Sequence, residues 1–189
     1  MAERRIHRAA RTVAAFAATS VLMAAAAGSA LSQQTAASMT GRDVQVMARA
    51  LGFMRPTPTG EAWVAVLFAP GDPASRQDAD RLTVLFGDGV RTSGAVLRAR
   101  PISADALSSD ARGYAALFLA SGAPADAALA AARVRHIACV TAALELVEAG
   151  RCTVWVRSDP RVEIVVSHAA AQSCGIEIAA AFRMMIREN

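Results

Sequence analysis

Short apolar runs recur along the chain, and residues 62–69 form an unbroken one. A strand that is covered on both faces has this pattern, because neither face meets water. The runs end at turn-forming residues, as at Pro70-Gly71-Asp72-Pro73, and each is short enough to be a strand. They predict four strands, at residues 62–69, 95–99, 114–120 and 136–141.

Outside these runs, apolar residues lie three and four positions apart, which is the spacing of one helix face. Thr40 is placed to cap the first of these helices. Ser75, with Asp78 three residues later, fits a capping box at the start of the second. The predicted helices cover residues 41–53, 76–86 and 125–133, with a single helical turn at 103–107.

Strands that alternate with helices favour parallel pairing, because each helix carries the chain back to the start of the next strand. The sequence therefore predicts an α/β fold in three layers, with a mostly parallel sheet flanked by helices. Two further β-rich runs, within residues 152–167, flank Ser158-Asp159-Pro160. So short a break predicts a C-terminal β-hairpin, which we expect at one edge of the sheet.

The last part of the chain supports two interpretations. An Ala-rich helix is expected to end at Gly175. Beyond it, Ile176 and Ile178 alternate as in a strand, whereas Phe182 and Ile186 suit a helix face. The pattern leaves strand and helix equally open for this tail.

The first 32 residues have the layout of a secretory signal peptide. A basic stretch ends at Arg11, an uncharged apolar stretch follows to Gly28, and Ala30-Leu31-Ser32 fits the cleavage pattern. The alternative is a transmembrane anchor, but the apolar stretch is shorter than the ~20 residues that a span needs. We therefore expect cleavage near Ser32 and export to the periplasm. The expected organisation is a leader at 1–32, an N-terminal segment with the first helix at 33–58, and one domain at 59–189.

Composition and charge favour an exported domain with its own core. The chain has 189 residues, 54% of them apolar, which suits one domain of ordinary size. The formal charge is +4, but four arginines and one glutamate in the leader account for +3, which leaves +1 for the processed chain. A nearly neutral domain gives no electrostatic basis for binding nucleic acid.

No set of residues has the spacing of a known active site. His136 and Cys139 suggest a nucleophile pair, but residues three apart on a strand point to opposite faces. Ser167 is best explained as the cap of a helix that begins at His168, and a Gly-x-Ser-x-Gly elbow is absent. Neither histidine beyond the leader has a carboxylate or thiol at metal-ligand spacing. The sequence thus predicts a protein that is not an enzyme and has no cofactor.

The run Gly87-Asp88-Gly89, followed by Gly94, imitates a dinucleotide-binding loop. Its spacing is wrong for that role, and it follows a helix instead of joining a strand to a helix. We therefore assign no nucleotide to it and interpret the first two glycines as the end of the helix at 76–86.

Three cysteines, Cys139, Cys152 and Cys174, allow three single pairings. In an exported protein, paired cysteines usually form disulfides. Cys139 and Cys152 head or lie in neighbouring predicted strands, and the helix-like link between them can bring them together, so this pairing is favoured over two buried thiols that never meet. Cys174 is then left over, either as a small buried apolar residue or as a redox-sensing or intermolecular thiol.

The stretch from Cys139 to Ile186 has these features in a defined order: Cys-Val, a short helical link ending Ala-Gly, a cysteine heading a strand, a turn, Val-Glu-Ile-Val-Val, an Ala-rich helix and Phe-Arg-Met-Met-Ile. This order resembles the YfiR family of periplasmic proteins, and the likeness continues more weakly through residues 60–80. The family also has a cysteine at the positions of Cys139 and Cys152. It often has Asn near Ser167 and His168, so the Ser-His here is a departure.

The resemblance implies a regulatory role that depends on binding. YfiR-like proteins hold a membrane diguanylate cyclase inactive through its periplasmic portion, and thereby restrain cyclic-di-GMP (c-di-GMP) signalling and biofilm formation. The family representative works as a dimer and responds to redox state. For this chain, the resemblance implies docking on such a cyclase, a homodimer, and a disulfide that locks residues 139–152 into the docking form.

Two other functions stay open. Residues 64–75 resemble the first strand and loop of periplasmic substrate-binding proteins, so a single-lobe small-molecule-binding protein is the first alternative. At the length of the processed chain, only one lobe of such a protein fits the usual domain size. An enzyme of uncharacterised type is the second alternative.

The end of the chain is the predicted working surface. Protein interfaces favour aromatic residues, methionine and arginine over lysine and glutamate. Phe182, Arg183, Met184 and Met185 have this composition. The alternative is that they are core residues with solvated arginines; if exposed, they form a patch for self-association or for a partner.

Overall fold

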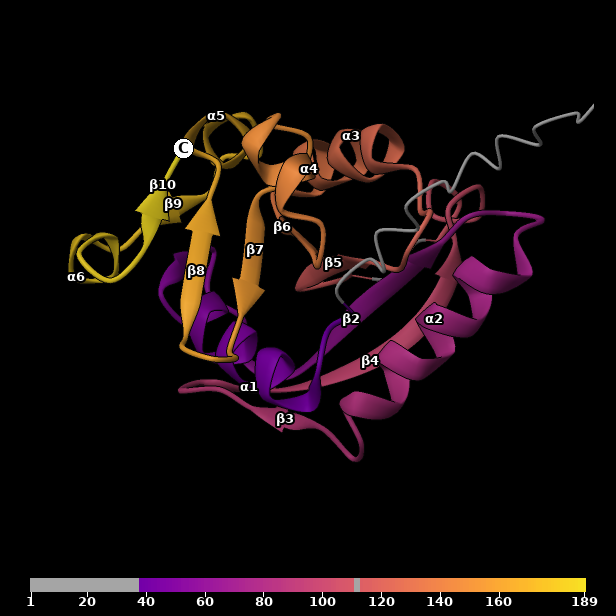
Figure 1. The fold of residues 1–189 in the computed structure, drawn as a ribbon, viewed down its shortest axis with the longest axis horizontal. Helices are drawn as coiled ribbons and strands as arrows, with labels where there is room; N and C mark the ends of the chain where they lie inside the picture. Colours follow the sequence, from indigo (N-terminus) through magenta and orange to yellow (C-terminus); the bar gives the residue numbers. More distant parts are fainter. Residues whose placement is uncertain (1–37, 111–112) are drawn as a thin grey trace, which may run out of the picture. The chain divides into compact units, whose positions relative to one another are not determined.

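A computed structural model of the protein describes residues 38–110 and 113–189, and the predicted leader lies outside the described residues. Within these ranges, eight strands form one sheet (Figure 1). Neighbouring strands are parallel except for the β7–β8 and β3–β4 pairs, so the predicted α/β fold with a mostly parallel sheet is confirmed. In spatial order the strands are β10 (Arg187–Glu188), β8 (Glu163–Val166), β7 (Val154–Arg157), β6 (Ala138–Thr141), β5 (Ala116–Leu119), β2 (Gly60–Phe68), β4 (Ala95–Ser103) and β3 (Val90–Arg91).

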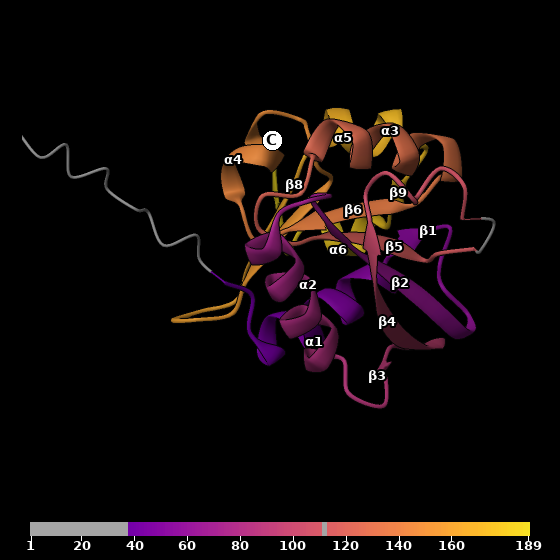
Figure 2. The same ribbon diagram turned by 90° about the vertical axis from the view of Figure 1, so that its right-hand side faces the viewer.

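Helices cover both faces of this sheet and make the predicted three layers. In Figures 1 and 2, α1 and α2 lie on one side of the central strands, and α3 and α5 lie on the other. The bounds of these helices, together with the short α4, are α1 (Gly41–Leu51), α2 (Pro73–Leu85), α3 (Ala125–Arg135), α4 (Leu144–Glu148) and α5 (His168–Ser173).

The central strands are apolar because helices cover both of their faces. Every residue of β5 and β6 is buried, as are Val64 to Leu67 of β2. Phe118 of β5 lies edge-on against Phe86, which follows α2, with ring centroids 5.3 Å apart. The uninterrupted apolar runs therefore mark the strands at the centre of the core.

The first helix begins and packs as its sequence predicts. Thr40 accepts a hydrogen bond from the Asp43 backbone N–H, and the Asp43 carboxylate accepts one from the Thr40 backbone N–H at 2.7 Å. This reciprocal capping satisfies N–H groups at the helix start that have no partner within the helix. The buried side of α1 includes Val44, Met47 and Leu51, which join the same hydrophobic core as the central strands.

The second helix begins three residues earlier than predicted, at Pro73. Its cap is Asp72, whose side chain accepts hydrogen bonds from the backbone N–H groups of Ala74 and Ser75. The Ser75 hydroxyl instead accepts from the Ala69 N–H at 2.9 Å, so the proposed Ser75–Asp78 capping box is wrong. Asp72 followed by Pro73 is a more favourable helix start than Ser75, because proline is favoured in the first helical turn, where its missing N–H is not needed.

Strand β4 is longer than predicted, because it pairs with β2 along nine residues, from Ala95 to Ser103. The proline at position 101 is tolerated because β3 covers only Val96 and Leu97 on the outer side of β4. The two-residue strand β3 was not predicted from the sequence. Residues 104–109 form turns, so the predicted helical turn at 103–107 is absent.

The predicted hairpin is confirmed as β7 and β8, which pair antiparallel from Val154↔Val166 to Arg157↔Glu163. It lies near one edge, although β10 pairs with β8 and forms the last strand. The chain between α5 and β10 contains both open alternatives in turn. It forms β9 (Glu177–Ile178), which pairs with β1 (Met54–Arg55) in a separate two-stranded sheet, and then the short helix α6 (Ala180–Arg183).

Candidate binding surface at the C-terminal segment

The C-terminal segment (residues 176–189) leaves the domain after α5 and returns to the edge of the sheet (Figure 1). At its start, β9 pairs with β1, and the Ala179 N–H donates to the Phe53 carbonyl at 3.0 Å. At its end, β10 pairs with β8, and the Asn189 N–H donates to the Val166 carbonyl at 2.9 Å. Both ends are thus held by backbone hydrogen bonds, and α6 and the turn that follows it lie between them.

Phe182 is an anchor of this segment and not part of an exposed patch. Its side chain is only 3% exposed and stacks on Phe53, with ring centroids 5.0 Å apart. The prediction that placed Phe182 among interface residues is therefore wrong. Removing an aromatic ring from water stabilises the folded protein relative to leaving the ring exposed. The ring therefore packs inward where the core has room for it.

Met184 and Met185, in contrast, are exposed by 90% and 62%. They follow α6 and lie in the turn that leads to β10. Phe53, the partner of Phe182, is also a partly exposed aromatic residue. Exposed methionine adapts its shape to different partners, because its side chain is unbranched and polarisable.

Arginines of the segment form ion pairs across its surface. Arg183 lies 3.5 Å from Glu188, and Arg187 lies 3.5 Å from Glu148 of α4. All four side chains are about one third to one half exposed, so each pair adds little stability. Arg183 directly precedes the exposed Met184 in the chain, whereas the pair with Glu148 holds Arg187 against α4.

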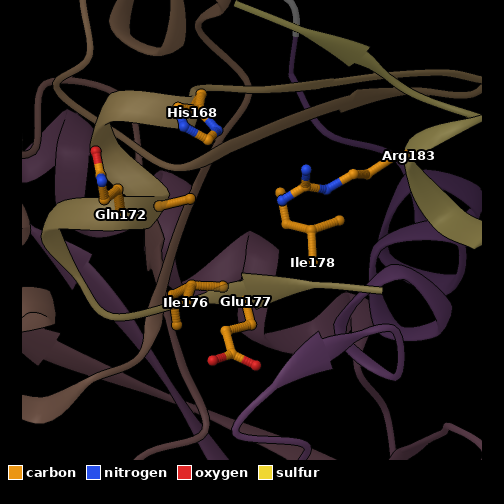
Figure 3. Close-up of a pocket in the computed structure, with 7 residues that line it drawn as sticks. His168, Gln172, Ile176, Glu177, Ile178 and Arg183 are labelled. Atoms are coloured by element: carbon orange, nitrogen blue, oxygen red, sulfur yellow. The ribbon is translucent and has the colours of Figure 1, made fainter. Parts of the chain in front are cut away.

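A pocket of about 340 Å³ lies between α5, β9 and α6 (Figure 3). In this view Arg183 reaches across the opening towards His168, Ile178 lies beneath its guanidinium, and the Glu177 carboxylate points away. The full lining is His168, Ala171, Gln172, Ile176, Glu177, Ile178 and Arg183.

The pocket combines an apolar floor with a few polar groups at its rim. Ile176 and Ile178 are buried, whereas Arg183, His168 and Gln172 are exposed. Its volume is at the lower end of the range for small-molecule sites, about 300–1,000 Å³. The arrangement suits contact with a small amphipathic group, either a free molecule or a side chain of a partner.

Cys139 and Cys152 form a disulfide, which confirms the predicted pairing. Their Cα atoms are 5.1 Å apart, and both residues are fully buried. Cys139 lies in β6, and Cys152 immediately precedes Thr153, whose hydroxyl accepts a hydrogen bond from the Cys139 N–H. A buried disulfide is typical of proteins from an oxidising compartment.

Cys174 is a free, buried thiol at the end of α5. Burial raises the pKa of the thiol, and contacts with Ser173, Thr153 and Arg133 offset this only partly. A thiol that is both buried and harder to ionise reacts slowly, because the thiolate is the nucleophile. The environment of Cys174 is thus that of a small buried apolar residue.

The residues considered for catalysis have structural roles. Cys139 is bridged, and His136 adopts a left-handed conformation at the end of α3, with its Nδ1 atom 3.2 Å from the Cys174 carbonyl oxygen. Ser167 caps α5, as predicted, by accepting a hydrogen bond from the Ala170 N–H. Among the described residues, no group of His, Cys, Asp and Glu side chains is arranged to hold a metal ion.

No family model and no curated protein matches the chain. The parts of the chain that the structure describes contain no helix with the length and apolarity needed to cross a membrane.

Two features of the C-terminal surface were missed in the sequence. The contact of Phe53 with Phe182 joins residues more than a hundred positions apart, and no local pattern indicates it. His168 was recognised only as the start of a helix, although it lines the pocket with Arg183. The polar residues of the short α5 were a possible signal of a binding site. Only the tertiary fold, however, brings them into one pocket with Arg183.

Proposed function

We propose that this chain is an exported regulatory protein of the YfiR type that acts by binding, without catalysis. Its partner is a membrane diguanylate cyclase, which it represses by docking on the periplasmic portion of that enzyme. The consequence is control of c-di-GMP level and biofilm formation. The observation that carries the proposal is the exposure of Met184 and Met185 on a segment that is fixed to the domain at both ends.

Exposed methionine beside arginine is a favourable docking surface. Both residue types are enriched in the buried centres of protein interfaces. The backbone pairing on each side of Met184 and Met185 reduces the conformational entropy that is lost on binding. The same patch offers a surface for the homodimer that the resemblance to YfiR implies.

The disulfide supports a periplasmic location, where such bonds persist. It also joins β6 to the residue before Thr153 and β7, in the part of the chain where the YfiR resemblance is strongest. We therefore propose that the bridged form is the one that docks, and that reduction weakens repression.

The test uses Met184→Glu and Arg183→Ala, in pull-down with the periplasmic segment of the cyclase and in sedimentation for dimerisation. Each change should weaken binding by more than about 1 kcal/mol, or about fivefold or more, because it removes apolar contact or a guanidinium from the centre of the patch. Both side chains are solvent-exposed, so the melting temperature of each variant should differ little from that of the unmodified protein.

Arg187→Ala is the matched control, since Arg187 is a similarly exposed arginine of the same segment that pairs with Glu148. It should bind as the unmodified protein does. Unchanged binding and unchanged dimerisation for both Met184→Glu and Arg183→Ala, with the fold intact, would remove this surface from the proposal.

A second candidate function is that of a single-lobe small-molecule-binding protein. The pocket beneath Arg183, with its apolar floor at Ile176 and Ile178, favours this alternative. A thermal-shift screen of small molecules distinguishes the two functions when it is compared with co-purification of membrane partners. A ligand that stabilises the protein, without any cyclase partner, would favour the second candidate.

A further inference from the structure

A second groove, separate from the C-terminal segment, lies between α1 and the turn that joins α2 to β3. Its volume is about 470 Å³. The helices α1 and α2 lie on the opposite side of the sheet from α5, which lines the C-terminal pocket (Figure 2). The lining consists of Gln45, Arg49, Val84, Leu85, Phe86, Gly87, Asp88, Gly89, Val90 and Arg91. We call it the α1–β3 groove.

The groove carries two arginines that have no partner. The side chains of Arg49 and Arg91 make no hydrogen bond or ion pair with any residue that the structure describes. Both are exposed, and Asp88 is the single acidic residue of the lining. The lining therefore has a formal charge of +1, with guanidinium donors available to carboxylates.

One wall of the groove is backbone, because Gly87-Asp88-Gly89 turns sharply between α2 and β3. Gly87 and Gly89 both have positive φ angles, of 50° and 128°. A Cβ atom on Gly89 would come within 2.5 Å of the Val96 side chain, so only glycine fits there. These two residues are thus required by the tight turn, and no nucleotide is needed to explain them.

The groove also adjoins a free sheet edge and an exposed apolar side chain. β3 is the last strand of the sheet on this side, so the outer side of its backbone has no strand partner among the described residues. Val84, at the end of α2, is 76% exposed. An extended peptide can use both features at once. Its backbone groups can pair with the strand edge, and its alternate side chains point in opposite directions, so one set can face the groove.

We propose that the α1–β3 groove binds an extended acidic peptide segment of a partner protein. Carboxylates of the peptide pair with Arg49 and Arg91, a small apolar residue between them contacts Val84, and the peptide backbone pairs with the edge of β3. A second copy of this chain is a poorer occupant: an antiparallel pairing of β3 with itself places Arg91 close to its symmetry mate, and like charges across strands are destabilising. The proposal does not depend on the function assigned to the C-terminal segment.

The experiment uses the processed protein and an acetylated hexapeptide of alternating Asp and Val. Binding is measured by calorimetry and by amide chemical shifts at about 0.15 M salt, where distant surface charges are screened. We expect a dissociation constant on the order of 0.1 mM or tighter, with the largest shifts at Gly87, Asp88 and Arg91. The same peptide with Asn in place of Asp should bind at least about tenfold more weakly.

Variants locate the site. Arg49→Gln and Arg91→Gln should each weaken peptide binding by about threefold to tenfold, and Val84→Asp should weaken it further by repulsion. Arg161→Gln is the matched control: Arg161 is exposed on the β7–β8 turn, has no side-chain partner among the described residues, and does not line the groove. It removes the same charge and should leave binding unchanged. Circular dichroism melting checks that every variant is folded.

Three results would overturn the proposal. They are the absence of shifts at residues 87–91 at about millimolar peptide, equal affinity for the Asp and Asn peptides, and equal loss of binding in Arg161→Gln and Arg49→Gln.

Inorganic phosphate is a further probe: if it displaces the peptide completely from the groove, the groove is a simple anion site and the peptide assignment is wrong. N-methylation of alternate peptide amides tests the strand pairing, because it removes donors that the edge of β3 requires.

Discussion

At the scale of single residues, Asp43 has a position that its sequence context explains only in part. It is the partner of Thr40 in the capping box of α1, and its side chain is almost fully buried. Burial pushes the pKa of the Asp43 carboxyl upward, but interactions with Ser158 and Thr40 outweigh this and leave the pKa below its usual value. Ser158 belongs to the β7–β8 turn, so the carboxylate at the start of α1 lies close to the tip of the hairpin, and its buried Oδ1 atom has no hydrogen-bond partner among the described residues.

Asp43→Asn should therefore lower the free energy of unfolding by about 1 kcal/mol at neutral pH. A carboxyl whose pKa is lower in the folded state stabilises the protein above its unfolded pKa, and this contribution is lost as pH falls through the folded pKa. The difference between the variant and the unmodified protein should thus shrink in acid. Urea denaturation at neutral pH and at about pH 3 measures it. A difference that stays constant with pH would show that the charge of Asp43 has no part in stability.

At the scale of elements, the C-terminal segment depends on a contact between parts of the chain that are distant in sequence. Phe182 of α6 stacks on Phe53, which follows α1, and β1 pairs with β9 beside this contact. The segment is therefore attached to the N-terminal helix as well as to the sheet edge.

Phe182→Ala should destabilise the protein by about 3 kcal/mol, because it removes a buried aromatic side chain and leaves a cavity. The loss should be local first: amide hydrogen exchange of Asn189, whose N–H donates to Val166, should accelerate. Phe182→Leu is the control, since it keeps most of the apolar volume and should cost less. Unchanged exchange in residues 176–189 of the alanine variant would contradict the anchoring role of this ring.

At the scale of the whole molecule, the disulfide joins the central strand β6 to the residues that lead into β7. Cys139 lies in the fully buried β6, and the bridge closes a loop with a sequence separation of 13 that contains α4. Such a loop restricts the unfolded chain, which raises the free energy of unfolding by about 3 kcal/mol in the chain-entropy model.

The double variant Cys139→Ser and Cys152→Ser should lose about this amount in urea denaturation, and its binding to the periplasmic segment of the proposed cyclase partner should weaken with it. Cys174→Ala is the matched control, because Cys174 is buried but not bridged. It should retain the disulfide and lose less stability. Equal stability of the bridged and unbridged proteins would show that the sheet positions these residues without help from the bond.

Local patterns alone determined much of this fold. The apolar runs at β2, β5 and β6 mark strands with two covered faces, since only such strands lack a polar side. Caps at Thr40 and Ser167 are recognisable because capping involves residues three positions apart. The pairing of Cys139 with Cys152 could also be predicted, because the two cysteines lie in or beside neighbouring strands.

Tertiary structure alone decided the ends of the elements and the surfaces. β4 extends to Ser103 because β2 pairs with it, and β3 exists because β4 offers an edge. Phe182 is buried and Met184 exposed, although both fit an interface composition, since only the packing against Phe53 distinguishes them. Sequence patterns describe interactions between near neighbours in the chain. Which apolar side chain reaches the core, and which polar groups share a pocket, depends on contacts between residues far apart in sequence.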